Sequence, residues 1–178
     1  MLSTHTISLV FDHDIYEKVL MEAVPAARQF LWIGTSDMKD LYVGRKGRMV
    51  PFLEVLSDLV NRNVSLRLIH AKEPGEAFRR DFDRYPSLVE GMERILCPRV
   101  HFKCVVADGT FAYTGSANLT GAGMGAKGDG KRNFETGIVT TDATLVAQIM
   151  EQFDSIWMGK RCAGCERKKY CADYKDLE

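Results

Sequence analysis

Short apolar runs alternate with segments of helical periodicity in the first half of the chain, and this alternation constrains the fold most strongly. The ranges 7–11, 29–35 and 64–70 read as buried strands because they are short, apolar and bounded by polar or turn residues. Between them, apolar residues recur every three or four positions, as on one face of a helix: Ile15, Val19 and Ala23, then Phe52, Val55, Leu56 and Leu59. Strands and helices in alternation predict an α/β domain built in layers.

The second half adds three strands and a long helix. We expect strands at 100–107, 110–114 and 134–140, with a short helix from Ser87 before them and a helix from Asp142 after them. Consecutive strands joined by tight turns run in opposite directions, so the sheet should be mixed and flanked by helices. Two capping-box patterns, Asp14 with Glu17 and Ser87 with Glu90, predict where two helices begin. The segment with Arg45, Lys46 and Arg48 is predicted to be a loop, and the charged segment up to Arg84 is assigned no element.

Composition narrows the class of protein. The chain has 178 residues, of which 46% are hydrophobic and 27% charged, as expected for one globular domain. Twenty-four basic and 24 acidic side chains cancel, so no overall field draws the protein to a polyanion and any anion site must be local. No apolar stretch approaches the roughly 20 residues of a transmembrane helix, and the start lacks the basic residues of a signal peptide. We therefore expect a cytoplasmic protein without a transmembrane segment.

The stretch HFKCVVADGTFAYTGSAN places an unusual polar set around a buried strand. Side chains alternate along a strand, so His101 and Lys103 lie side by side on one face. The turn after Asp108 leads into the next strand, whose end brings Ser116 and Asn118 close to the same place. A nucleophile, a cation and two neutral hydrogen-bonding groups suit a phosphate diester.

This spacing resembles a known motif. His101-x-Lys103-x4-Asp108, then six residues, then Gly115-Ser116-x-Asn118, is similar to the HKD motif of the phospholipase D superfamily. That superfamily includes phospholipases, phosphatidyltransferases and metal-independent nucleases. The resemblance implies a phospholipase D-like catalytic domain over residues 1–158, followed by a cysteine-rich tail at 159–178.

The resemblance also implies roles for individual residues. His101 would attack phosphorus and form a phosphohistidine, while Lys103 and Asn118 hold the nonbridging oxygens and Ser116 supports the site. Asp108 would be a structural or orienting partner. Glu135, in RNFETG, resembles the carboxylate that in single-motif members hydrogen-bonds the active histidine and fixes its tautomer.

A single motif implies a homodimer, because the family chemistry uses two histidines. A two-fold axis near the site would bring both copies of His101 to one phosphate, one neutral to attack and one protonated to donate. No cofactor or divalent metal is expected to take part in the chemistry. The glycine-rich loop at 121–132 is either a mobile rim that closes over substrate or an ordinary surface loop.

Three cysteines crowd the end of the chain, Cys162, Cys165 and Cys171, at a density that suits a metal better than disulfides in a reducing compartment. A tetrahedral centre needs a fourth thiolate. Cys104 lies on the inward face of the His101 strand and is expected to be a core residue, whereas Cys97 lies in a loop and is free to reach out. We therefore expect Cys97 to be the fourth ligand.

The spacing x2, x5 is similar to that of iron–sulfur sites in some nucleases, which favours a structural [4Fe–4S] cluster. Zinc on the same four thiolates is the alternative, and reduced, unliganded thiols are the third reading. In either metal case the centre would pin the C-terminus to the element that presents His101. Basic residues surround these cysteines, and either follow a nucleic-acid backbone or offset the thiolate charge: Lys160, Arg161, Arg167, Lys168 and Lys169.

The predicted function is a homodimeric phosphodiesterase acting on nucleic acid. The small size, the single motif and the basic tail favour a nuclease over a lipase. The loop after Asn118 offers only Leu119 and Met124 as an apolar rim for acyl chains. A phospholipase D-type lipid hydrolase or phosphatidyltransferase is one alternative, and a non-catalytic nucleic-acid-binding or metal-sensing module is the other.

Overall fold

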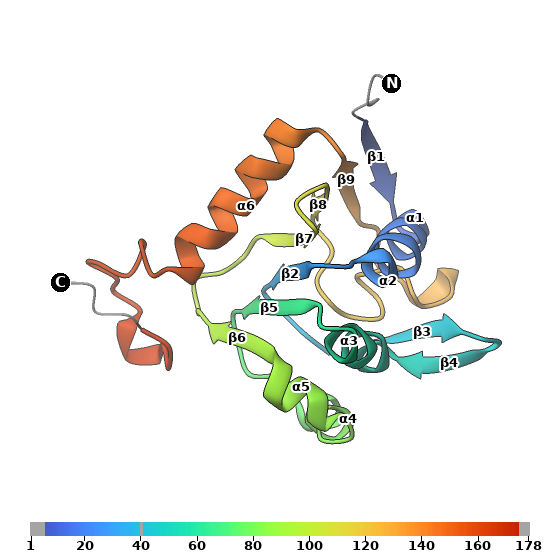
Figure 1. The fold of residues 1–178 in the computed structure, drawn as a ribbon, viewed down its shortest axis with the longest axis horizontal. Helices are drawn as coiled ribbons and strands as arrows, with labels where there is room; N and C mark the ends of the chain where they lie inside the picture. The colour runs from blue at the N-terminus through green and yellow to red at the C-terminus, as the bar shows by residue number, and fades with distance from the viewer. Residues whose placement is uncertain (1–5, 40, 175–178) are drawn as a thin grey trace.

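A mixed seven-stranded sheet forms the centre of the protein (Figure 1). The computed structural model describes residues 6–39 and 41–174. The strand order is β1-β9-β8-β7-β2-β5-β6. The strands are β1 (Ile7–Phe11), β2 (Phe30–Thr35), β5 (Ser65–His70), β6 (Met92–Leu96), β7 (Lys103–Ala107), β8 (Phe111–Gly115) and β9 (Thr136–Thr140). Neighbours β2, β5 and β6 pair in parallel, whereas β1, β9, β8, β7 and β2 pair antiparallel, which confirms the predicted mixed sheet.

Helices cover both faces of this sheet. One face carries a continuous helical segment made of α1 (His13–Ile15), η1 (Tyr16–Ala23) and α2 (Val24–Ala26), together with α3 (Phe52–Asn61). The opposite face carries α6 (Ala143–Trp157) (Figure 1). Consecutive residues of β7 show the two layers: Val105 packs into the cluster that contains the α3 side chains, and Val106 packs with Val146 of α6. The α/β layered fold expected from the sequence is thus confirmed.

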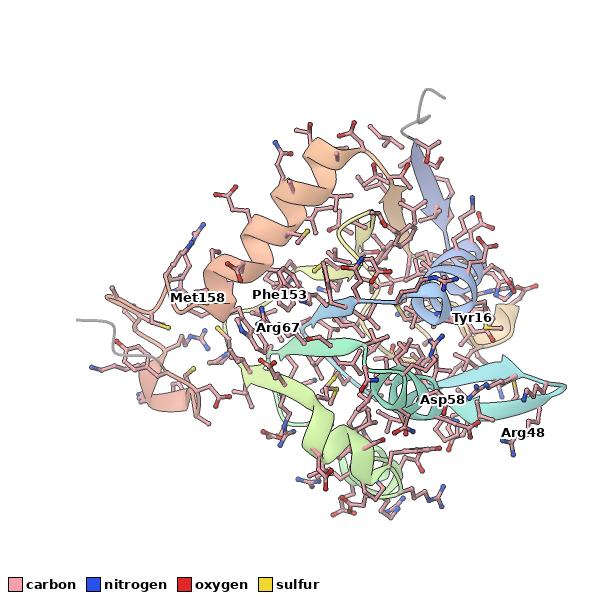
Figure 2. The ribbon with its side chains drawn as sticks, in the orientation of Figure 1. Tyr16, Arg48, Asp58, Arg67, Phe153 and Met158 are labelled. Atoms are coloured by element: carbon pink, nitrogen blue, oxygen red, sulfur yellow. The ribbon has the colours of Figure 1, made fainter. Side chains whose placement is uncertain are left out.

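Four elements were not predicted: β3, β4, α4 and β6. The segment around Arg45 and Arg48 is a hairpin of β3 (Tyr42–Arg45) and β4 (Arg48–Pro51), not a loop. Its turn residues Lys46 and Gly47 both have positive φ, 50° and 77°, a geometry that joins antiparallel strands tightly. Figure 2 shows Arg48 on this hairpin, where its guanidinium pairs with Glu54 of α3 at 3.2 Å. The charged segment before Arg84 contains α4 (Glu76–Phe82), and β6 follows α5 (Pro86–Gly91).

Both capping-box predictions are wrong. The first helix begins at His13, after Asp12, and Asp14 lies inside it without capping it. The second, α5, begins at Pro86, and the hydroxyl of Ser87 bonds that of Ser57 at 2.8 Å instead of a backbone amide. By contrast, Asp142 begins α6 as predicted, because its carboxylate accepts a hydrogen bond from the amide of Leu145 at 3.0 Å.

Aromatic packing fastens the end of α6 to the sheet. The guanidinium of Arg67 on β5 lies between two indole rings, 5.5 Å from the centroid of Trp32 and 4.9 Å from that of Trp157. Phe153 stacks between the same two indoles, and Figure 2 shows it beside Arg67. The segment that carries the C-terminal cysteines therefore begins at a helix end that is packed firmly on the sheet. Among the described residues, no helix combines the length and apolarity needed to cross a membrane.

Candidate active site

One end of the sheet gathers most of the residues that the motif singles out. The strands β2 and β5 end there, at Thr35 and His70, and β7 and β9 begin there. Gly115, at the end of β8, pairs with Lys103 at the start of β7 and with Gly137 near the start of β9. A side chain on either glycine would collide with its neighbours: a Cβ at Gly115 would come within 2.5 Å of the carbonyl oxygen of Thr136 and 2.6 Å of the Tyr113 hydroxyl, and a Cβ at Gly137 within 2.5 Å of the Tyr113 ring. The paired ends of β7 and β8, next to which Lys103 and Ser116 lie, are therefore tightly packed against Tyr113 and β9.

His101 and Lys103 are in direct contact. The Nζ atom of Lys103 lies 3.3 Å from Nδ1 of His101 and donates a hydrogen bond to the carbonyl oxygen of the same residue at 2.7 Å. Lys103 is 6% exposed, whereas His101, just before β7, is exposed. A buried cation thus lies beneath an imidazole that solvent and substrate can reach.

Electrostatic forces on Lys103 oppose each other. Burial lowers the pKa of Lys103 below its ordinary value, because an ammonium loses hydration there, and the nearby carboxylate of Glu135 partly counteracts this fall. The interaction places Glu135 in the same electrostatic environment as the motif lysine. A phosphate dianion or diester bound beside Lys103 would complete the neutralisation of this buried charge.

Glu135 does not reach His101 within the chain, so the contact that the resemblance implied is not formed. The hydroxyl of Ser116 donates to one carboxylate oxygen of Glu135, and Nδ2 of Asn133 donates to the other at 2.9 Å. The backbone of Glu135 is held by Asp12, whose carboxylate accepts from its amide at 2.7 Å. Asp12 and Asn133 are thus residues of the site that the sequence did not reveal. The positive φ of Asp12, 45°, marks the sharp turn that brings it here.

Asn118 uses its carbonyl to hold the loop after β2. Its Oδ1 accepts hydrogen bonds from the hydroxyl of Ser36 at 2.7 Å and from the amide of Asp37 at 3.2 Å. Because a backbone amide only donates, the bonded atom of Asn118 must be oxygen, which identifies the other end as the NH₂ group. The Asn118 side chain therefore keeps a hydrogen-bond donor for a phosphate oxygen. Neither Ser36 nor Asp37 was predicted as part of the site.

Asp108 lies apart from the other motif residues. It occupies the turn after β7, at the opposite end of the strand from Lys103. Its carboxylate accepts backbone hydrogen bonds from Arg28, Gln29 and Phe30 at 2.8–3.2 Å. Burial alone would raise the pKa of Asp108, but these amides outweigh it and hold the pKa below its ordinary value. This position fits the structural or orienting role that the resemblance implies for Asp108, whose place among the catalytic residues stays a prediction.

The glycine-rich loop is fixed over its first half. The carbonyl of Gly125 lies 2.9 Å from Nδ1 of His13, and a Cβ at Gly125 would come within 2.3 Å of the carbonyl oxygen of Asp12. Residues 127–131 of the same loop are exposed. Leu119 and Met124, the two apolar residues available for an acyl-chain rim, are 6% and 2% exposed and belong to the core. They cannot form such a rim.

An open groove of about 570 Å³ begins at His101. Its other side chains come from the segment before His101 and from the C-terminal segment: Pro98, Arg99, Val100, Glu166 and Arg167. Two guanidinium groups and one carboxylate give this groove a positive balance. It runs from the exposed imidazole to the cysteine-rich segment. Of the residues of the HKD motif, His101 alone lines it.

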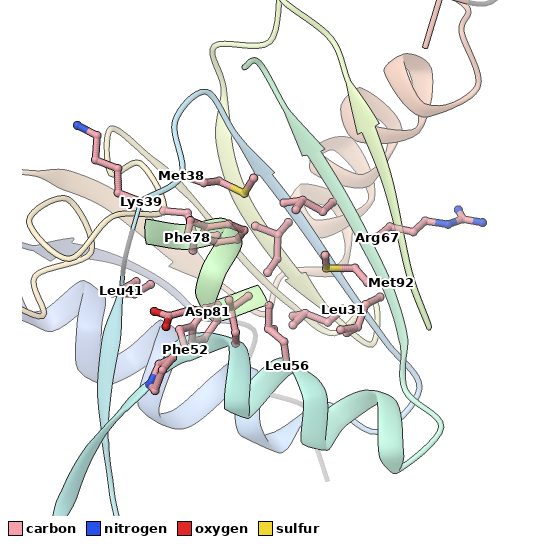
Figure 3. A pocket seen from close by; sticks show the side chains of 16 residues that line it. Leu31, Met38, Lys39, Leu41, Phe52, Leu56, Arg67, Phe78, Asp81 and Met92 are labelled. Carbon is pink, nitrogen blue, oxygen red and sulfur yellow. The ribbon is translucent and has the colours of Figure 1, made fainter. Parts of the chain in front are cut away.

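A small, mostly apolar cavity is separate from this site. It lies between α3, α4 and the sheet, and its volume is only about 20 Å³. Figure 3 shows its aliphatic and aromatic side chains, such as Leu31, Leu56 and Phe78, turned toward one another, while Arg67 points away from them. None of the motif residues lines it. It is a small packing gap in the core, too small for an acyl chain or a nucleotide.

The four cysteines predicted to bind a metal lie together. Cys97, Cys162, Cys165 and Cys171 all line one cavity of about 130 Å³, and all four are free thiols. Across the described parts of the chain, no three His, Cys, Asp or Glu side chains are arranged to hold a metal ion. Cys104 is 3% exposed in the core, as predicted, where burial raises the pKa of its thiol to about 12.

Comparisons with known proteins agree with the fold and the motif. The family model described as "Cardiolipin synthase, PLD-like domain" matches residues 20–157. No curated protein matches the chain. Among solved structures, NucT from Helicobacter pylori has a TM-score of 0.64 at 14% sequence identity, over 86% of this chain and 96% of NucT. Nuc from Salmonella typhimurium, described as a phospholipase D family member, has the same TM-score and identity over 86% and 94% of the two chains.

A third solved structure shows the same fold within a larger protein. Phosphatidylserine synthase from Haemophilus influenzae matches with a TM-score of 0.62 at 14% identity, over 87% of this chain and 39% of the synthase. At such low identity the structural matches show the fold alone. The family model covers most of the chain and includes the whole HKD motif. The chain belongs to the phospholipase D superfamily, whose members act on phosphodiester bonds.

Proposed function

We propose that this protein is a phosphodiesterase that cleaves nucleic acid through a phosphohistidine on His101, in a homodimeric site that needs no divalent metal. The observation that carries the proposal is the contact between exposed His101 and buried Lys103 at the start of a positively lined groove. The imidazole is accessible for attack, and the cation beneath it attracts the phosphate. Arg99 and Arg167 along the groove suit the adjoining phosphates of a polynucleotide strand.

The chemistry proceeds in two balanced steps. A nitrogen lone pair of neutral His101 attacks phosphorus, the bond to the leaving oxygen breaks, and that oxygen takes a proton from the protonated His101 of the partner subunit. Water then attacks the phosphohistidine, giving a proton back to that imidazole while the phosphorus–nitrogen bond breaks. Lys103 and the NH₂ group of Asn118 would stabilise charge on the nonbridging oxygens in both steps.

The described part of one chain does not provide the second imidazole. His70 is 1% exposed, and its Nδ1 lies 2.9 Å from the carbonyl of Lys72. His13 is bound to Glu17 at 3.2 Å and to the carbonyl of Gly125. His5 lies outside the described residues. We therefore assign the role of proton donor to the His101 imidazole of a second copy of the chain.

An uncovered strip of the sheet would receive that second copy. On the edge strand β1, Val10 packs into the core, so its neighbours Leu9 and Phe11 project from the opposite face together with Ile7. These three side chains are 51–67% exposed, and β7 and β8, on which α6 mainly packs, are separated from β1 by β9. The strip ends at Asp12, which holds Glu135 in the site. A two-fold contact here would lie next to the site that needs completion.

A lipid phosphodiester is the second candidate substrate, favoured by one observation. Phe134 is 95% exposed and directly precedes Glu135. An exposed aromatic beside the site suits contact with a lipid surface. The match to a family model named for cardiolipin synthase is consistent with this candidate.

One set of assays separates these functions. Purified protein is incubated with single-stranded DNA, RNA and phosphatidylcholine vesicles, each in the presence of EDTA. We expect a nucleic acid to be cleaved, with activity lost in His101→Ala and kept in the control His13→Gln, which removes a half-exposed imidazole elsewhere. Cleavage of lipid alone, with loss in Phe134→Ser, would replace the nuclease by the lipid hydrolase. Binding of nucleic acid without turnover would show a non-catalytic module.

A further inference from the structure

The C-terminal segment folds around its cysteines. From Lys160 to Tyr174 the chain contains a single short helix, η3 (Lys168–Tyr170), and no strand. In this segment every residue is exposed except Cys162, Cys165, Cys171 and Tyr174. A segment with so little apolar burial lacks the usual source of stability, yet its three thiols all turn inward.

The same segment is docked against the strand that precedes Cys97. The thiol of Cys171 donates to the carbonyl of Leu96 at 3.3 Å, and the carboxylate of Asp173 accepts from the amide of Leu96 at 2.7 Å. Cys97 follows directly and is anchored by a bond from its amide to the carbonyl of His70 at 2.8 Å. The fourth thiol is thus held by the sheet, and the other three are brought to it from more than 60 positions along the sequence.

The volume of the cavity between the cysteines favours one kind of metal centre over another. Four thiolates around one zinc ion lie about 3.8 Å from each other, because each is about 2.3 Å from the metal in a tetrahedron. The described residues contain no group of three ligands arranged for a single ion. Instead the four cysteines lie among the residues that line a cavity of about 130 Å³. A cubane cluster occupies space between its ligands, so the cavity suits it better than an ion.

Cationic side chains line the same cavity. Arg99 and Arg161 both face it, and Arg99 lies within hydrogen-bonding reach of the Cys165 thiol. Four thiolates bring a large negative charge, which neighbouring guanidinium groups offset. We propose that Cys97, Cys162, Cys165 and Cys171 bind a [4Fe–4S] cluster that joins the C-terminal segment to the connection leading to His101.

The position of the cluster gives it a structural role beyond the proposed phosphodiesterase. Cys97 lies four positions before His101, and Arg99 between them lines both the cysteine cavity and the groove at the histidine. Arg167, two positions after Cys165, lines the same groove. A cluster that crosslinks these segments would fix both of them along the groove.

Anaerobic purification of the full chain tests the proposal. We expect about four iron and four sulfide per chain and a broad visible absorbance band that bleaches on reduction. One zinc per chain, or protein without metal, would overturn the cluster. The measurement does not depend on catalysis, and His101→Ala should keep the full iron content. Loss of nuclease activity and loss of the cluster can therefore be told apart.

Single cysteine variants identify the ligands. Replacement of Cys97, Cys162, Cys165 or Cys171 by alanine should remove most of the iron, whereas Cys104→Ala should retain it, because Cys104 is buried away from the cavity. Circular dichroism of each variant reports whether the sheet is intact. The ligand set would be contradicted if Cys97→Ala kept its full iron content. It would also be contradicted if a folded Cys104→Ala protein lost its iron while the other variants kept theirs. If a ligand variant does not fold, the iron and sulfide content of the wild-type chain still shows whether a cluster is bound.

Discussion

The ammonium of Lys103 lies 3.3 Å from Nδ1 of His101, and it also holds the carbonyl oxygen of that residue at 2.7 Å. One side chain therefore fixes the backbone of the histidine and places a positive charge next to its ring. Because Lys103 is almost fully buried and His101 is exposed, the pair has an inner cation and an outer nucleophile. The predictions below test this arrangement and the residues that support it.

Lys103→Met should abolish most activity and leave the protein folded. Methionine keeps an unbranched chain in the buried position but removes the charge that would stabilise the phosphate oxygens. We expect kcat to fall about 10²- to 10³-fold, as for loss of one preorganised electrostatic group. The control Lys18→Met, on the exposed side of η1, should be unaffected. Wild-type turnover by a folded Lys103→Met protein would exclude the lysine from the chemistry.

Glu135→Gln should lower the pKa of Lys103. Burial lowers this pKa and the Glu135 carboxylate raises it, so removal of the carboxylate charge leaves burial less opposed. The amide can still accept the hydrogen bond from Ser116. NMR titration with lysine labelled at Cε measures the effect, and Lys103→Met assigns the signal. An unchanged midpoint would show that the two charges do not interact; Glu17→Gln, on exposed η1, is the control.

Asn118→Asp should separate the structural and catalytic uses of this side chain. A carboxylate can still accept the bonds from Ser36 and Asp37, so the free energy of unfolding should change by less than about 1 kcal/mol. It has no NH₂ group to donate and adds a negative charge beside the substrate phosphate. We therefore expect kcat/KM to fall at least 100-fold. Activity close to that of the wild type would mean that the NH₂ group does not face the substrate.

Asp108→Ala should destabilise the protein by about 1–3 kcal/mol, because it leaves backbone donors of residues 28–30 without their acceptor. Asp108→Asn should cost less, since asparagine keeps an acceptor and tolerates the positive φ of 54°. Activity per folded molecule should be unchanged in both, because Asp108 lies at the far end of β7. A specific loss of kcat in a folded Asp108→Asn protein would place Asp108 in the active site after all.

The wild type and Asp108→Asn should differ in how their free energy of unfolding depends on pH. The pKa of Asp108 is lower in the folded than in the unfolded chain, so the folded chain binds this proton less readily. Its contribution to stability is therefore full above the unfolded value of 3.8 and is lost as the pH falls through the folded value. In urea titrations, the stability advantage of the wild type over Asp108→Asn should shrink over that range. A constant difference would contradict the assignment.

Most of the sheet could be predicted because its strands are apolar and bounded by turn residues, as β2 and β5 show. The edge strand β6 was missed because its residues Glu93 and Arg94 are charged and exposed, as is common in edge strands, and so break the apolar pattern of a buried strand. The β3–β4 hairpin was missed because a basic, glycine-containing segment reads as a loop. The Lys46-Gly47 turn was the available signal.

The motif located the site, but the partners of its residues depend on tertiary packing. The sequence spacing gave no means to see that Glu135 would bond Ser116, or that the carbonyl of Asn118 would hold the loop at Ser36. Asp12, 123 positions before Glu135, becomes part of the site only because β1 pairs with β9. The expected grouping of Cys97 with the three C-terminal cysteines agrees with their shared cavity, whereas the metal itself stays a prediction.

The most direct test of the central claim is the activity of a mixed dimer. Wild-type and His101→Ala chains carrying different affinity tags are co-expressed, and the heterodimer is isolated through both tags. Because each shared site would need one His101 from each copy, we predict that the heterodimer has less than about 1% of wild-type activity, like the His101→Ala homodimer. Half of the wild-type activity in the heterodimer, or full activity in a monomeric wild-type protein, would contradict the shared site.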